Sequence, residues 1–97
     1  MRLPKYRKPT TPGEILAEEF LKPMDLTQGE LANHLGWTTT KVNQIVRGKR
    51  AVTPETALAL SDVFGTTPDF WLNAQQACDL WEAVQSHRKI ARLNRAS

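Results

Sequence analysis

The sequence predicts an all-α domain of five helices, and three observations support this prediction. Five pairs of helix-start and helix-stop residues follow one another at short spacing, with Thr or Pro at the starts and Gly or Pro at most stops. No segment alternates apolar and polar residues as a half-buried strand does. The chain has 97 residues, of which 40% are hydrophobic, and this suits one domain with a single core.

The first two helices are placed by their N-caps. Prolines punctuate the opening of the chain, so residues 1–10 are expected to form an extended basic arm. Thr11 is expected to cap the first helix, which has Pro12 at its first position and ends before Pro23. Residues 27 to 30 have the spacing of a capping box, which opens the second helix.

Three further helices are expected after Gly36, which ends the second helix. Their predicted starts are Thr38, Thr53-Pro54-Glu55 and Thr67-Pro68-Asp69, and their predicted ends are Gly48, Phe64-Gly65 and about Gln85. We therefore divide the chain into the arm (1–10), a helical domain with a long last helix (11–86) and a basic tail (87–97).

Residues 28–47 have the spacing of two short helices that cross at a tight turn. Ala32 is small enough to let one helix approach the other closely, and Gly36 can adopt the positive φ that the turn requires. Val42 and Ile45 lie on one helical face and are expected to pack back onto the preceding helix. This arrangement predicts a helix-turn-helix, whose second helix is built to enter the major groove of DNA.

The formal net charge is only +3, but the charges are segregated along the chain. Between Glu30 and Glu55 there is no acid, and the cations are Lys41, Arg47, Lys49 and Arg50. A basic surface over the second helix of the motif is expected where a protein contacts DNA phosphates. From residue 51 to residue 87 the pattern inverts, and the only charged side chains are Glu55, Asp62, Asp69, Asp79 and Glu82.

One polar face of the third helix is left for DNA if Val42, Ile45 and Val46 point inward. The residues on that face are Thr39, Thr40, Asn43, Gln44 and Arg47. Asn and Gln pair bidentately with adenine, and threonine methyls favour the thymine methyl, so we expect A·T base pairs within each half-site. The alternative interpretation of this face is an ordinary solvated helix surface.

Other polar residues are better placed for phosphates than for bases. Gln28 is expected to hold a phosphate together with the N-terminal amides of the second helix. The remaining expected DNA contacts, next to the third helix or on it, are Thr38, Lys41, Lys49 and Arg50.

The fifth helix carries a heptad-like apolar face that predicts a homodimer. Its residues are spaced 4, 3, 4, 3 and are Phe70, Ala74, Ala77, Trp81 and Val84. A dimer would bind two half-sites about one helical turn apart. Trp71 and Cys78 broaden this face. The alternative is that the face covers the core of the monomer. For Phe70 and Trp71 the sequence favours the two interpretations equally, and for Trp81 and Val84 it favours the dimer.

No catalytic, metal or cofactor site is predicted. His34 and His87 stand alone, without a second His or Cys at metal-ligand spacing, and no phosphate-binding loop or nucleophile–base set occurs. The single cysteine, Cys78, excludes an intrachain disulfide and fits a reducing compartment. No apolar run approaches the length of a membrane span. We therefore expect a cytoplasmic protein that is not an enzyme.

Several strings resemble the HigA family of antitoxins over about residues 12 to 81. They are Pro12-Gly-Glu-Ile-Leu16, Glu19-Phe-Leu21, Gly48-Lys-Arg-Ala-Val-Thr-Pro-Glu-Thr-Ala-Leu58 and Phe64-Gly-Thr-Thr-Pro-Asp-Phe-Trp-Leu-Asn73. The resemblance implies a phage-repressor-like (lambda repressor-like) helical domain, a homodimer that represses its own operon, and neutralisation of a HigB-like toxin that cleaves messenger RNA. It carries over as DNA contacts Gln28, Thr39, Thr40, Asn43, Gln44 and Arg47. The chain departs from the family pattern at Ala74 and Ala77, where Leu and Tyr are frequent.

Three functions remain open at this stage: an antitoxin that also represses its operon, a stand-alone transcriptional regulator, and a helical adaptor. If a toxin is bound, the acidic side of the first and fourth helices, with Glu55 and Asp62, is the expected surface. The basic arm is an alternative, since it can order on a partner or follow the minor groove of DNA.

Overall fold

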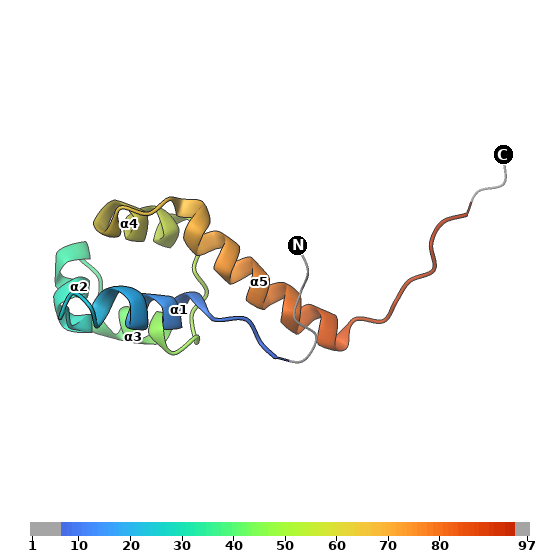
Figure 1. Ribbon diagram of the computed structural model, residues 1–97, viewed down its shortest axis with the longest axis horizontal. Helices are drawn as coiled ribbons and strands as arrows, with labels where there is room; N and C mark the ends of the chain where they lie inside the picture. The colour runs from blue at the N-terminus through green and yellow to red at the C-terminus, as the bar shows by residue number, and fades with distance from the viewer. Residues whose placement is uncertain (1–6, 95–97) are drawn as a thin grey trace.

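The computed structural model describes residues 7–94 and shows an all-α fold with the predicted five helices (Figure 1). The first helix begins as α1 and continues as a π-helix, η1. The bounds are α1 Pro12–Ile15, η1 Leu16–Leu21, α2 Gln28–Leu35, α3 Thr39–Val46, α4 Pro54–Phe64 and α5 Pro68–Ser86. The molecule is elongated, 60 × 27 × 21 Å, because α5 runs away from the other helices and residues 87–94 continue outward without regular structure. The outer parts of the predicted arm and tail, 1–6 and 95–97, lie outside the described residues.

The predicted helix starts and stops are confirmed by the capping geometry. Each predicted threonine is an N-cap whose hydroxyl accepts the N–H three residues on: Thr11, Thr27, Thr38, Thr53 and Thr67. The capping box is complete, since the Thr27 N–H also donates to Glu30 Oε1 at 2.9 Å. Gly36 and Gly65 adopt φ of 72° and 73° at the C-caps of α2 and α4. These termini are local in origin, so short-range chemistry is enough to set them.

The first helix differs from the single α-helix that the sequence predicts. From Leu16 to Leu21 it is a π-helix, and the Lys22 N–H donates to the Ala17 carbonyl five residues back at 3.0 Å. Pro23 gives a physical reason, because its ring would clash with the carbonyl four residues earlier in a regular α-helix. The wider winding before it is compatible with that restriction.

The core lies where η1, α2, α3, α4 and the start of α5 meet. Its largest fully buried side chains are Trp71, Leu16, Leu31, Ile45, Leu60 and Val42. Phe20 of η1 packs against Phe64 of α4 and Trp71 of α5, with ring centroids 4.8 and 5.3 Å away. This cluster fixes the first helix to the last two. No helix in residues 7–94 is long and apolar enough to cross a membrane.

The inner part of the N-terminal arm has no helix or strand over residues 8–10 and lies against α5. The Lys8 ammonium pairs with the Glu82 carboxylate of α5 at 3.2 Å. The Cys78 thiol lies 3.6 Å from the carbonyls of Pro9 and Thr10, where burial raises its pKa and keeps it protonated. Residues 8–10 therefore follow α5, an arrangement that only the folded helix reveals.

Candidate nucleic-acid interface

The turn between α2 and α3 positions the candidate site. Gly36 has φ 72° and ψ 25°, so the chain leaves α2 in the left-handed conformation and re-enters a helix at the Thr38 cap. Val42 and Ile45 are 0% and 1% exposed and hold α3 against the core. The predicted bend and inward face of α3 are confirmed, and the polar face opposite them points away from the protomer core.

That polar face has a centre and two edges. Thr40 and Arg47 lie seven residues apart, two helical turns, and both are exposed. Asn43 and Gln44 are only half-buried and flank this centre line on opposite sides. Thr39 is exposed at the start of the helix. The helix thus offers an exposed threonine and arginine between two more sheltered amides.

Asn43 lies on the edge that faces α2. Its Nδ2 donates to Gln28 Oε1 at 3.1 Å, and this hydrogen bond joins the two helices of the motif. Gln28 is the first residue of α2. A phosphate at that N-terminus would meet free helical N–H groups and the side-chain amide of Gln28 together. The contact fixes the relative position of the residues predicted to contact phosphate and base.

Gln44 lies on the other edge, beside the loop that follows α3. Its Oε1 accepts from Arg50 Nε at 3.0 Å and from a terminal guanidinium nitrogen of Arg50 at 2.8 Å. Its backbone carbonyl accepts the N–H groups of Lys49 and Arg50 at 2.8 and 3.1 Å. The bidentate adenine contact predicted from sequence is therefore not available to Gln44 in this conformation, since both lone pairs of its side-chain oxygen are occupied.

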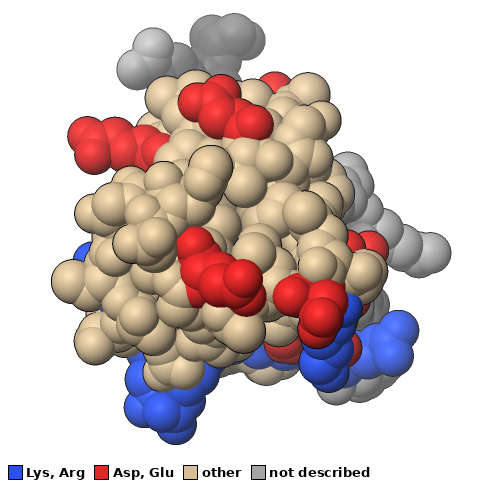
Figure 2. Space-filling model, turned by 90° about the vertical axis from the view of Figure 1, so that its left-hand side faces the viewer, with Lys and Arg blue, Asp and Glu red and all other residues tan. Residues whose placement is uncertain are grey.

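The remaining predicted phosphate contacts surround the same face. The Lys41 ammonium lies 4.0 Å from the centre of the Trp37 ring, a cation–π contact that holds it beside the turn. Thr38 accepts the Lys41 N–H at 3.1 Å, and Lys49 is exposed. Figure 2 shows Lys and Arg mainly along the lower edge of the molecule, the edge that α3 occupies in Figure 1, and Asp and Glu over the middle and upper parts.

Comparisons with known proteins agree with this arrangement. The helix-turn-helix family model HTH_3 matches residues 18–71. Antitoxin HigA-1 of Vibrio cholerae is 37% identical over 86 residues, which cover 89% of this chain and 81% of the relative. The chain belongs to the HigA family.

Two further relatives of this HigA-family chain bear on its function. YbaQ of Escherichia coli K12, described as an uncharacterized HTH-type transcriptional regulator, is 47% identical over 89 residues, 92% of this chain and 79% of that protein. The structure of Pseudomonas aeruginosa antitoxin HigA with the higBA promoter has a TM-score of 0.78 and 37% identity, and the match covers 81% of this chain and 86% of that one.

The predicted dimer face of this HigA-family chain is divided between the protomer and solvent. Trp71 is fully buried, which settles it as a core residue. Phe70 is 40% exposed and packs edge-on against Trp71, with ring centroids 5.1 Å apart. Ala74, Ala77 and Trp81 are half-buried, and Val84 is 52% exposed. The end of the helix that projects from the body therefore keeps apolar surface in solvent, together with Leu80.

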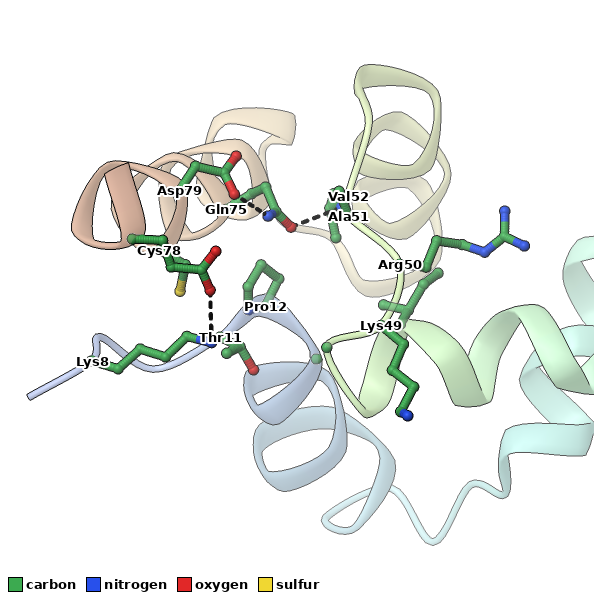
Figure 3. Close-up of a pocket in the computed structure, with 14 residues that line it drawn as sticks. Lys8, Thr11, Pro12, Lys49, Arg50, Ala51, Val52, Gln75, Cys78 and Asp79 are labelled. Carbon is green, nitrogen blue, oxygen red and sulfur yellow. Dashed lines mark hydrogen bonds and ion pairs between the residues drawn. The ribbon is translucent and has the colours of Figure 1, made fainter. Parts of the chain in front are cut away.

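The sequence does not predict the contacts of two residues that position the candidate interface. Gly13 of α1 lies against the carbonyls of Ile45 and Val46, so the first helix touches the end of α3. Gln75 of α5 accepts the Val52 N–H at 2.8 Å and holds the loop after α3 beside a cavity of about 190 Å³ (Figure 3). Both contacts join segments distant in sequence, and no local spacing signals them.

Residues 7–94 contain no group of three or more His, Cys, Asp or Glu side chains placed to hold a metal ion. The chemistry at the interface is hydrogen bonding and charge: hydroxyls, amides and a guanidinium on α3, with lysines at both ends.

Proposed function

We propose that this chain is a dimeric transcriptional repressor that inserts α3 into the major groove of its operator. The observation that carries the proposal is the exposed polar face of α3, with Thr40 and Arg47 at its centre and Lys49 and Arg50 beside it. The HigA structure solved with the higBA promoter supports it, since that protein shares this fold. Base contacts from the polar face of α3, and phosphate contacts from the cations around it, are the arrangement expected of such a helix.

Salt-dependent binding to the chain's own promoter tests the proposal. Lys49→Gln should weaken binding to every duplex and reduce the slope of log K against log salt by about 1, since one phosphate contact is lost. Gln44→Ala should blunt sequence preference and leave the slope unchanged. No mobility shift at physiological salt would exclude the repressor and leave the helical adaptor.

We further propose that the chain is an antitoxin that neutralises a HigB-like ribonuclease. Membership of the HigA family supports this function, and the exposed acids Glu55 and Asp62 of α4 supply a surface that a basic partner would complement. In Figure 1 α4 and α3 lie on opposite sides of the compact end, so a partner bound to α4 would leave the DNA face accessible.

The toxin surface can be tested with two variants that change the net charge equally, one on α4 and one on α5. Glu55→Gln with Asp62→Asn should slow association with the toxin at low salt, because steering by opposite charge is lost. The matched control, Gln76→Lys with Gln85→Lys, changes net charge by the same amount on α5 and should leave association nearly unchanged. Equal association rates for the wild type and the Glu55→Gln, Asp62→Asn variant would contradict this surface.

A stand-alone regulator without a toxin is the second candidate, and the 47% identity to YbaQ, a protein described as a transcriptional regulator, favours it. Co-expression of the chain with the product of the adjacent reading frame separates the two. A stable complex that abolishes ribonuclease activity supports the antitoxin. Operator binding without any such complex supports the regulator.

A further inference from the structure

The side-chain amide of Gln44 is held in one orientation by Arg50. A guanidinium has only donors, so the atom that it contacts through Nε and a terminal nitrogen, at 3.0 and 2.8 Å, must be the amide oxygen. The two contacts use both lone pairs of that oxygen. The amide nitrogen, with its two hydrogens, is left as the only group of the Gln44 side chain that can contact a base.

The backbone at Arg50 is held in place by hydrogen bonds of the residues before and after it. Gly48, with φ 72°, donates to the Ile45 carbonyl, and Lys49 donates to the Gln44 carbonyl, which together form a Schellman motif at the end of α3. Two residues further on, the Val52 N–H is anchored by Gln75 of α5, whose amide also donates to Asp79. Figure 3 shows the Arg50 side chain pointing away from the cavity that the loop covers.

This orientation decides which base suits Gln44. Adenine, in its bidentate contact with an amide, needs an acceptor for its N6 amino group and a donor to N7. Gln44 has donors only, whereas guanine presents two adjacent acceptors, N7 and O6, in the major groove. We propose that Arg50 is a specificity-determining residue that makes Gln44 a donor-only contact and thereby selects guanine at the base pair that Gln44 faces.

The inference rests on the DNA binding proposed above and departs from the A·T preference that residue types alone predict. Asn43, on the opposite edge of α3, is not restricted in the same way, since its contact with Gln28 uses one amide hydrogen and its oxygen accepts no hydrogen bond within residues 7–94. The two amides of α3 are thus expected to differ in base preference although their side chains carry the same functional group.

Selection from a library of duplexes with a randomised central segment tests the inference. Gln44→Ala identifies the base pair that Gln44 faces, as the position whose preference is lost. Wild-type protein should favour guanine over adenine there by about 10-fold. Arg50→Lys keeps the positive charge but cannot chelate the amide oxygen, so the freed amide should bind adenine at least as well as guanine.

Two controls keep the result interpretable. Lys49→Gln changes a charge in the same loop without touching the Gln44 side chain, and it should keep the guanine preference. In a Gln44→Ala background, Arg50→Lys should alter base preference at no position. If the Gln44→Ala protein, with Arg50 intact, still prefers guanine and Arg50→Lys removes that preference, Arg50 contacts the base directly and the inference is wrong.

The remaining outcomes are also decisive. A wild-type preference for any base other than guanine at that pair, or a guanine preference unchanged in Arg50→Lys, would overturn the inference while the repressor function stands. Absence of binding to any duplex would instead contradict the proposed function. Thermal unfolding of each variant close to that of the wild type would confirm that these substitutions leave the fold intact.

Discussion

Gly13 decides how closely the first helix approaches the end of α3. A Cβ at this position would lie 2.6 Å from the Val46 carbonyl oxygen and closer still to that of Ile45. Both obstacles are backbone atoms, which cannot move aside as a flexible side chain can. The absence of a side chain at Gly13 thus allows α1 to lie directly against the end of α3.

Gly13→Ala should therefore lower the free energy of unfolding by about 2 kcal/mol or more, as overpacking of a tight contact does. Urea unfolding measures the change. Gly29→Ala is the matched control, because its nearest neighbours would be 3.9 Å from the new Cβ and alanine is the better helix former. An equal effect of the two substitutions would show that the α1–α3 contact is not tight in solution.

Glu30 gives the capping box a dependence on pH. Hydrogen bonds from the Thr27 backbone N–H, and secondarily from its hydroxyl, hold the pKa of this carboxyl below its ordinary value of 4.5. A folded-state pKa below the unfolded one means that the stabilisation is complete above 4.5 and is lost as pH falls through the folded value.

Glu30→Gln keeps an oxygen that can accept the Thr27 N–H but removes the titration. Wild-type protein should be the more stable of the two at neutral pH, and the difference should shrink as the pH is lowered from 4.5 downward. Urea unfolding at a series of pH values measures it. A difference that is constant with pH would show that the carboxyl titrates alike in the folded and unfolded chain.

At the scale of elements, the helix termini and the packing of α3 on α2 could be predicted from the sequence, and the hydrogen bonds made by the loop after α3 could not. Thr27 and Gly36 cap α2 through contacts with residues only three or four positions away in the sequence. The residue types at these two positions are therefore enough to predict where α2 begins and ends. The Arg50–Gln44 and Gln75–Val52 hydrogen bonds depend on where a loop lies after folding. The prediction of adenine contacts treated Gln44 as a free side chain, and the fold gives it a partner that residue type alone does not reveal.

The hydrogen bond between Gln75 of α5 and the loop after α3 can be tested by its contribution to stability. Gln75→Leu leaves the partly buried Val52 N–H without its acceptor and should lower the free energy of unfolding by about 1 to 2 kcal/mol. Gln75→Glu keeps an oxygen acceptor for the Val52 N–H but places a second carboxylate beside Asp79, and the two carboxylates repel each other. The double variant Gln75→Glu with Asp79→Asn keeps the acceptor and removes this repulsion. Recovery of stability in the double variant, measured by urea unfolding, would assign the loss to this hydrogen bond. Equal losses in all three variants would contradict it.

At the scale of the whole molecule, the predicted DNA-binding face and the predicted dimer face lie at different ends of an elongated shape. The compact end contains α2 and α3, with Lys and Arg near the predicted DNA face, whereas α5 projects from it and keeps Leu80 and Val84 46% and 52% exposed (Figures 1 and 2). A projecting helix with apolar side chains in solvent gains stability when a second copy covers them. Such a dimer would also carry two copies of α3 on one duplex.

Val84→Glu should therefore convert the protein to a monomer, because a charge buried at the contact between two α5 helices is strongly unfavourable. Loss of the second half-site should lower operator affinity by at least about 100-fold, the usual gain from linking two binding modules. Gln85→Glu introduces the same charge on the neighbouring position and should preserve the dimer. Sedimentation at micromolar concentration without DNA measures the oligomeric state. A wild-type monomer under those conditions would contradict the dimer, and a dimeric Val84→Glu variant would place the contact elsewhere on the molecule.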